Sequence, residues 1–380
     1  MTRLSADWLA HSRHLALFDL FERNGFQLYY VGGCVRDALI GLGASDIDMA
    51  TDARPNQMEA MAKSAGIATF DVGKDHGTVG FGGASSVEVT TFREDVATDG
   101  RAAKVAFGTS LETDAERRDF TMNALYCDRE GAVIDPMDGM DDLTARRIKF
   151  IGDPATRIKE DHLRILRFFR FHAYFGDPDA GIEQEGLAAC AAHAESLDRL
   201  SRERVGAEMR RLLDAPDPGP AVAAMAQSGV LARVMPGADA RYLAPLVHLE
   251  AQRPAIWPRR AAVLGGEALT DQWRLSKAEA RNLDLLKSLV SDPMAIAEVA
   301  YRHGAQVATD ATILRATIFE APEILDDLHQ IPSAEKANFP VKAADLPATL
   351  KGPEIGATLR DLENQWIASG FTLSKSDLLR

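Results

Sequence analysis

Cysteine and long apolar runs are scarce in this sequence of 380 residues. The three cysteines, Cys34, Cys127 and Cys190, are odd in number and lack metal-ligand spacing, which predicts reduced thiols rather than a disulfide scaffold. No apolar run approaches the roughly 18 residues of a membrane span, and Met1–Ser12 has no apolar core of the signal-peptide type. We therefore expect a cytoplasmic protein with no membrane partner.

Positive charge is also in short supply, because the formal net charge is −13 at pH 7. This acidity argues superficially against nucleic acid, but phosphate contacts are local and a global balance is weak evidence. Residues 143–175 hold eight basic and three acidic side chains, and residues 199–211 hold five and two. Both basic segments are candidate RNA-binding surfaces, although each alone is also typical of a solvated helix face.

The chain divides into a mixed part and a helical part. Short β-branched segments alternate with helical patterns up to residue 142, and beyond it the pattern is almost wholly helical. The predicted fold class is α+β, an N-terminal mixed β-sheet with helices followed by an all-α C-terminal region, in three parts: residues 1–142, 143–213 and 214–380. Strands are expected at 28–31, 46–50, 68–72, 78–82, 86–92, 124–127 and 133–135, and early helices at 7–24, 34–42 and 55–65.

The most informative segment is Val31-Gly32-Gly33-Cys34-Val35-Arg36-Asp37, followed by Asp46-Ile47-Asp48. Glycines let backbone N–H groups approach a phosphate closely, as the N-terminus of a helix also does. Side chains at i and i+2 of a strand point the same way, so Asp46 and Asp48 are expected side by side. Mg²⁺ commonly binds through one or two carboxylates plus substrate phosphates. The combination predicts a nucleotidyl-transfer site.

A third carboxylate strengthens this interpretation. Glu88 lies in the β-branched segment Ser86–Phe92, and on the neighbouring strand it would complete a two-metal cluster with ions roughly 3.5–4 Å apart. The plainer alternatives are a solvated Asp-x-Asp turn, an ordinary Gly-Gly turn and a glutamate facing solvent. The order and spacing of the segments favour Asp46, Asp48 and Glu88 as catalytic metal ligands, with Mg²⁺ as the cofactor.

Three further motifs follow along the chain: Arg117–Ala124, then Asp153–Arg167 with its Glu160-Asp161-x-x-Arg164 element, then Ser201–Arg204 with Glu208. On these motifs and the first, the chain resembles the bacterial-type (class II) tRNA nucleotidyltransferases, the CCA-adding enzymes, in the family shared with bacterial poly(A) polymerases. The match covers roughly residues 27–212 with specific motifs. The three predicted parts would then be a nucleotidyltransferase head, a neck for nucleobase reading and RNA binding, and a tRNA-binding body and tail.

The resemblance implies template-independent addition of C, C and A to the 3′ end of tRNA, from CTP and ATP, with release of pyrophosphate. Gly32, Gly33 and Arg36 would contact the triphosphate, and Arg118 is a further phosphate clamp because Arg matches phosphate oxygens bidentately. Asp119 is associated with ribose recognition in the family. The plainer alternative for Arg117-Arg118-Asp119 is a cluster of salt bridges at the surface. The implied nucleotide-binding residues are Gly32, Gly33, Arg36, Arg118, Asp119, Asn123, Asp161, Arg164 and Arg167.

The resemblance assigns base recognition to Asp161 and Arg164. With Arg157 they are spaced i, i+4, i+7, which predicts one shared helix face; a mutually paired charged face is the plainer alternative. Cytosine and adenine each present an amino donor beside a ring-nitrogen acceptor, while an ionised Asp can only accept and Arg can only donate. Uracil and guanine would place a carbonyl against Asp161, a mismatch that buried polar groups reject strongly.

Two connections bear on which member of the family this is. Asp71–Val79 departs from the basic segment of the family's poly(A) polymerases, which favours CCA addition over polyadenylation. The polar, glycine-containing connection Phe92–Arg117 predicts a mobile loop rather than a strand, with an exposed hairpin as the alternative. Because family members limited to C-C tend to lack such a loop, we expect addition of the whole C-C-A.

The expected partner is tRNA, with CTP and ATP as substrates and no protein partner inferred. Arg210 and Arg211 are the predicted RNA contacts, since phosphate neutralisation by Arg and Lys dominates affinity for nucleic acid. The alternatives are a poly(A) polymerase of the same family, a catalytically inactive RNA-binding relative, and a small-molecule nucleotidyltransferase. The last shares the metal motif but would not need the Glu160–Arg164 element.

Overall fold

The protein forms two compact units, Met1–Pro236 and Gly237–Arg380, in a computed structural model. The boundaries expected after residues 142 and 213 stay predictions. The structure describes residues 2–43, 46–74, 77–82, 86–98, 103–108, 110–347 and 349–380.

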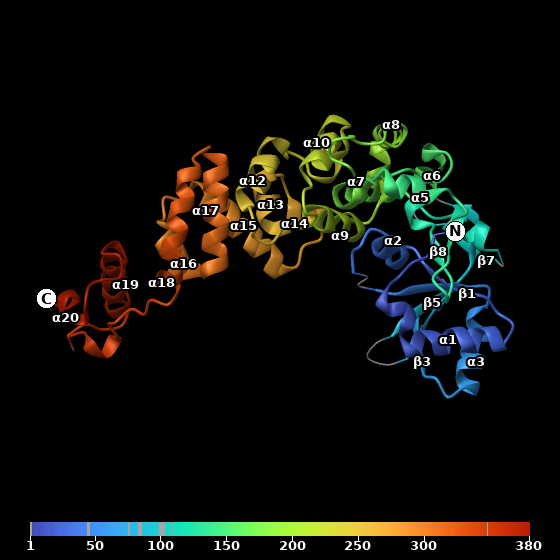
Figure 1. The fold of residues 1–380 in the computed structure, drawn as a ribbon. Coiled ribbons are helices and arrows are strands. Elements are labelled where there is room, and N and C mark those ends of the chain that lie inside the picture. Colours follow the sequence, from blue (N-terminus) through green and yellow to red (C-terminus); the bar gives the residue numbers. More distant parts are fainter. Residues whose placement is uncertain are drawn as a thin grey trace. The chain divides into compact units, whose positions relative to one another are not determined.

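Seven strands form one mixed sheet within the described residues of the first unit, in the order β3-β4-β5-β2-β1-β8-β9 (Figure 1). Neighbouring strands are antiparallel except for β2 and β5, which run parallel. The predicted α+β class is confirmed. The strands are β1 Leu28–Val31, β2 Asp48–Thr51, β3 Thr69–Gly73, β4 Thr78–Phe81, β5 Val87–Thr91, β8 Tyr126–Cys127 and β9 Val133–Ile134.

The second strand begins later than predicted. Asp48 is its first residue and pairs with Glu88 of β5, whereas Asp46 lies in a bend before the strand. The prediction that Asp46 and Asp48 alternate along one strand is therefore wrong. The pairing explains the difference, because β5 itself begins at Val87 and the parallel ladder starts one residue later.

Helices α1 and α3 pack beside this sheet, α2 and α4 lie between its strands in sequence, and the helices from α5 onward follow it (Figure 1). Helix α6 begins at Pro154, and the Asp153 carboxylate caps it by accepting the backbone N–H of Thr156 at 2.8 Å. The helices are α1 Ser12–Arg23, α2 Gly33–Leu39, α3 Pro55–Ser64, α4 Leu111–Glu116, α5 Gly139–Thr144, α6 Pro154–Glu160, α7 Arg164–Phe175, α8 Gln184–Ala192, α9 Arg202–Leu213, α10 Gly219–Gln227 and α11 Val230–Val234, with 3₁₀ helices η1 Asp7–Ala10, η3 Thr121–Asn123 and η4 Ala194–Arg199.

The connection after Phe92 forms a hairpin and not the predicted loop. β6 Arg93–Thr98 pairs antiparallel with β7 Ala103–Phe107, with an irregularity between Asp95 and Ala97. Residues 99–102, at its end, lie outside the described residues. The polar composition misled the prediction because a two-stranded ribbon needs no alternating apolar face.

The single helix predicted across Arg157, Asp161 and Arg164 is wrong. α6 ends at Glu160, and Asp161 has extended backbone angles, φ −147° and ψ 109°. Its carboxylate accepts the backbone N–H of Leu163 at 3.1 Å, a local bond through which Asp competes with helix continuation. α7 then begins at Arg164, so these three residues do not share one helix face.

An aromatic cluster joins the sheet to the helices that follow it. Phe120, beside η3, lies 4.9 Å from Phe150 and 5.1 Å from Phe171 between ring centroids. Phe150 stacks on Phe168 of α7 at 5.4 Å with an interplanar angle of 13°. Phe120, Phe150 and Phe168 are at most 1% exposed, so this contact is a core of its own.

The second unit is built from helices, with one isolated β-bridge between Ala238 and Gly265 among its described residues. Ser276 and Glu279 form a capping box at the start of α15. The second unit also contains a buried polar network, in which Arg259 and Arg260 pair with Glu250 and Arg259 pairs with Asp310 as well. The helices are η5 Ala240–Tyr242, α12 Leu243–Glu250, α13 Trp257–Leu264, α14 Leu269–Gln272, α15 Lys277–Ser291, α16 Ile296–His303, α17 Ala305–Ile318, η6 Pro322–Gln330, α18 Ile331–Glu335, η7 Ala343–Asp345, α19 Pro353–Ala368 and α20 Lys375–Leu378.

None of the helices in the described ranges combines the length and the apolar character that crossing a bilayer requires.

Replacement of Phe168 by alanine should destabilise the first unit, since it removes the ring that stacks on Phe150 in a fully buried position. We expect the free energy of unfolding to fall by about 3–5 kcal/mol, measured by urea denaturation. Phe319→Ala is the matched control, because that ring is 56% exposed, and it should cost less than about 0.5 kcal/mol. Equal effects of the two variants would contradict the assignment of this cluster as a core.

Candidate nucleotide-binding site

The turn after β1 needs its first glycine. Gly32 has φ 75°, a left-handed conformation that side chains disfavour, and a Cβ there would lie 3.3 Å from Nη1 of Arg118. Gly33 then begins α2. The turn and the Arg118 guanidinium thus lie in close contact, as expected of two phosphate-binding elements.

Two of the three predicted metal ligands are neighbours in the sheet. Asp48 and Glu88 are partners across β2 and β5, and both are exposed at their strands' surface. Desolvation and the nearby carboxylates of Glu88 and Asp46 raise the pKa of Asp48, while Arg118 opposes the shift. Neighbouring carboxylates repel one another, and a bound cation would relieve that repulsion.

A complete metal cage is not preformed among the described residues, where no three His, Cys, Asp or Glu side chains gather closely enough to hold an ion. Asp48 and Glu88 still suit Mg²⁺, which usually keeps several waters and shares its ligands with substrate phosphates. Asp46, in the bend, is the predicted ligand that strand geometry supports least. The metal assignment of all three stays a prediction.

A chain of hydrogen bonds crosses the floor of the site. Arg36 donates from Nη1 to Oδ1 of Asn123 at 2.6 Å, and Asn123 donates from Nδ2 to Asp119 at 2.9 Å. The Asp119 carboxylate also accepts from Nε of Arg167 at 2.7 Å. Arg36 is 7% exposed and stacks beneath the ring of Phe175, 4.0 Å from its centroid. These predicted nucleotide contacts are therefore also part of the framework.

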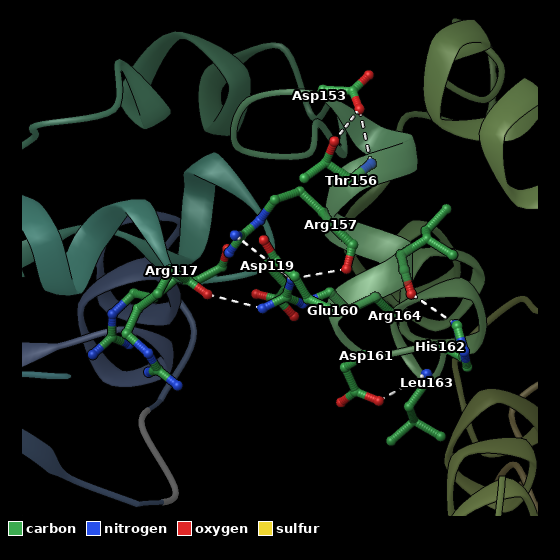
Figure 2. A network of polar contacts seen from close by, with 12 residues as sticks. Arg117, Asp119, Asp153, Thr156, Arg157, Glu160, Asp161, His162, Leu163 and Arg164 are labelled. Atoms are coloured by element: carbon green, nitrogen blue, oxygen red, sulfur yellow. Dashed lines mark hydrogen bonds and ion pairs between the residues drawn. The ribbon is translucent and has the colours of Figure 1, made fainter. Parts of the chain in front are cut away.

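Backbone carbonyls just before Asp119 are held from the helical segment, as Figure 2 shows. Arg164 donates from Nη2 to the carbonyl of Arg117 at 2.9 Å, and Arg157 donates from Nη2 to the carbonyl of Arg118 at 2.7 Å. Both guanidinium groups also pair with Glu160. The segment after α4 and the α6–α7 junction are thereby locked together.

Asp161 is oriented by two donors. Its Oδ1 accepts from the backbone N–H of Leu163, and its Oδ2 accepts from Nη2 of Arg204 on α9 at 2.7 Å (Figure 2 for the first bond). Each carboxylate oxygen can accept more than one hydrogen bond. Asp161 is therefore fixed in place with acceptor capacity to spare.

These groups surround one cavity of about 510 Å³, a size typical of small-molecule sites. Six arginines and three aspartates line it, a positive balance that suits a triphosphate. Four predicted site residues lie outside the lining: Asp46, Glu88, Arg210 and Arg211. Ten line it: Gly32, Gly33, Arg36, Asp48, Arg118, Asp119, Asn123, Asp161, Arg164 and Arg167.

Comparison with known proteins agrees with this site. The profile described as "Poly A polymerase head domain" matches residues 28–149, and that described as "Probable RNA and SrmB- binding site of polymerase A" matches residues 181–241. The chain is 32% identical to the mitochondrial CCA tRNA nucleotidyltransferase 1 of Danio rerio, over 96% of this chain and 89% of that protein. It is 31% identical to the CCA-adding enzyme of Levilactobacillus brevis, over 94% of each.

This chain belongs to the class II CCA-adding tRNA nucleotidyltransferases. Its fold agrees as well, since it superposes on the Bacillus stearothermophilus CCA-adding enzyme in complex with CTP with a TM-score of 0.73 and 27% identity, covering 94% of this chain and 92% of the other. The resemblance found in the motifs is thus confirmed. Nucleotidyltransferases of this family typically use a divalent metal.

Sequence reasoning missed four lining residues of this family member: Arg117, Leu163, Phe171 and Arg204. Arg117 and Arg204 stand inside recognised motifs, so their position was available as a signal. Their role was not, because it depends on contacts between segments far apart in sequence. Leu163 and Phe171 read as ordinary core residues of a packed helix.

The Asp119 carboxylate should make the stability of this enzyme depend on pH. Burial opposes its ionisation, but Arg167 and Asn123 outweigh that effect and lower the pKa of Asp119 to about 2, from an ordinary 3.8. The unfolded chain therefore takes up the proton first as pH falls. The resulting stabilisation, about 2 kcal/mol, is present above pH 4 and is lost as pH falls towards 2.

Urea unfolding of the wild type and Asp119→Asn between about pH 5 and pH 2 measures this effect, and the difference between them should shrink on acidification. Asp310→Asn is the control, because burial raises the pKa of Asp310 despite its ion pair with Arg259, so its difference from the wild type should not shrink. A pH-independent difference for Asp119→Asn would contradict the assignment.

Proposed function

We propose that this chain adds C, C and A to the 3′ end of tRNA, using CTP and ATP and releasing pyrophosphate. The observation that carries the proposal is the single cavity that joins the Gly32 turn, Arg118 and Asp48 to Asp161 and Arg164. One end suits a triphosphate beside a metal carboxylate, and the other offers an acceptor and a donor to a base. The two relatives described above, which align with nearly the whole of this chain, are named as a CCA tRNA nucleotidyltransferase and a CCA-adding enzyme.

Asp48, Glu88 and Asp46 would hold Mg²⁺ together with the triphosphate. When bound, such ions activate the attacking 3′-hydroxyl and stabilise the leaving pyrophosphate. The chain's own part is to place the phosphates: the backbone of the Gly32 turn approaches them closely, and the Arg118 guanidinium beside it carries charge and directional N–H groups.

Asp161 and Arg164 would read the base. Three of the five Arg164 N–H groups are used by described residues, on the carbonyls of Arg157 and Arg117 and on Glu160. The remaining donors can bond a ring nitrogen, while Asp161 accepts from the amino group that cytosine and adenine share. Uracil and guanine would set a carbonyl oxygen against the carboxylate.

The tRNA would bind along the helical part of the chain. Arg210 and Arg211 lie in the last turn of α9, and Arg211 is exposed with Glu208 at 3.8 Å as an ion-pair partner. Their charge suits backbone phosphates, which dominate recognition of RNA helices. The β6–β7 hairpin forms the connection between the first two motifs. The presence of such a connection is the basis for proposing addition of the whole C-C-A.

Asp48→Ala should abolish nucleotide addition and leave tRNA binding within about twofold, since the carboxylate serves metal and phosphate and not the RNA surface. The assay incubates the protein with a tRNA lacking C-C-A, Mg²⁺ and each labelled triphosphate in turn. The wild type should incorporate CTP and then ATP, but neither UTP nor GTP.

Three outcomes would contradict the proposal. Near-normal addition by Asp48→Ala would remove that carboxylate from the reaction. Repeated addition of ATP by the wild type, without CTP, would indicate polyadenylation. Arrest of the wild type after C-C would contradict addition of the terminal A.

Asp161→Ala should reduce base discrimination, because it removes the acceptor that rejects a carbonyl. We expect the ratio of kcat/KM for CTP over UTP to fall about tenfold or more. Asp153→Ala is the matched control from the same segment (Figure 2), since that carboxylate caps α6 through Thr156 and should cost about 1 kcal/mol of stability without changing the ratio. Equal loss of rate for all four nucleotides in Asp161→Ala would make the residue structural.

A further inference from the structure

Asp114 is a buried carboxylate directly behind the site, and the proposed reaction gives it no role. It is 2% exposed, lies on α4 and accepts hydrogen bonds at both oxygens. Oδ2 accepts from Nη2 of Arg118 at 2.9 Å and from the hydroxyl of Tyr126 at 2.7 Å. Oδ1 accepts from the backbone N–H of Arg93, the first residue of β6, at 3.1 Å.

We propose that Asp114 is a positioning residue that aims the Arg118 guanidinium at the nucleotide triphosphate. This inference rests on the proposed function, which supplies the triphosphate. Asp114 does not line the cavity, so its effect on the nucleotide would pass through Arg118.

One edge of the Arg118 guanidinium is hydrogen-bonded to Asp114, and Nη1, at the other edge, lies beside the Gly32 turn. Nε and Nη2 of Arg118 face Asp114, at 3.2 Å and 2.9 Å. Nε also lies 3.2 Å from the Tyr126 hydroxyl, and the guanidinium carbon is 5.3 Å from that ring. Nη1 points instead to the Gly32 turn, 3.3 Å from where a Cβ would stand. Because the guanidinium is planar and rigid, the bonds to Asp114 fix the direction in which the opposite edge of Arg118 points.

Charge also holds this pair together. Burial disfavours the charged form of Asp114, but Arg118 and Tyr126 outweigh it and lower the pKa of Asp114. The ion pair of Asp114 and Arg118 is therefore present at neutral pH.

The test is a double-mutant cycle of Asp114→Asn, Arg118→Ala and both together, with dissociation constants measured for CTP and for inorganic triphosphate in Mg²⁺. Asp114→Asn should weaken both ligands about tenfold, the usual scale for loss of a charged hydrogen bond. In the Arg118→Ala background the same substitution should have no further effect, because the group through which it acts is gone. The CTP-to-UTP preference should stay unchanged.

Two controls make the result specific. Asp310→Asn neutralises another buried Asp that is paired with an arginine, in the second unit, and should leave both constants unchanged. Tyr126→Phe removes the hydroxyl that donates to Asp114 and accepts from Arg118. It should weaken triphosphate binding less than tenfold, and it should have no effect in the Arg118→Ala background. This variant supplies the same cycle if Asp114→Asn does not fold.

Additive effects in the cycle would overturn the inference, since Asp114 would then act without Arg118. Loss of CTP binding with unchanged triphosphate binding would overturn it as well. Failure of the wild type to bind either ligand would instead overturn the proposed function itself.

Discussion

Three arginines of the helical segment hold three consecutive residues of the head, and the rest of the site depends on this clamp. The donors come from α6 and α7, and the acceptors are two backbone carbonyls and one carboxylate of residues 117–119. Three bonds at successive positions restrict both sliding and rotation of the helices against residues 117–119. They thereby fix Arg118, the proposed phosphate contact, relative to Asp161 and Arg164, the proposed base-reading pair. The bonds are Arg164 to Arg117 O at 2.9 Å, Arg157 to Arg118 O at 2.7 Å and Arg167 to Asp119 at 2.7 Å.

The aromatic cluster supplies apolar contact directly beside these three bonds. Phe120 directly follows residues 117–119 and packs on Phe150 and Phe171. The same short segment therefore makes both the polar bonds that set the position of the helices and the apolar contacts that are buried. Packing alone would tolerate small shifts, whereas a guanidinium fork accepts few angles. Lysine at position 157, 164 or 167 would keep the charge but lose the fixed direction. The burial stabilises the contact, and the arginines determine its register.

Local patterns predicted the class of fold and strand β1 with its bounds, because turns and strand alternation are local properties. Most of the ten predicted residues around the cavity were implied instead by the resemblance to the family. Local patterns failed where partners lie far apart in sequence. β2 starts at Asp48 because β5 pairs with it there, and Arg204 enters the site because α9 lies beside the α6–α7 junction. The role of Asp114 was likewise invisible, since a lone carboxylate on a short helix indicates nothing until Arg118 and Tyr126 are placed around it.

The helix break at Asp161 shows why the failed prediction matters for function. On one continuous helix, Asp161 and Arg164 would be spaced i, i+3 and could pair with each other, leaving neither available to a base. With extended backbone at Asp161, the carboxylate instead pairs with Arg204, and Arg164 pairs with Glu160. Asp161 and Arg164 are thus each held by another partner and do not pair with one another. The break therefore separates an acceptor from a donor at one cavity, which is the arrangement that recognition of cytosine and adenine requires.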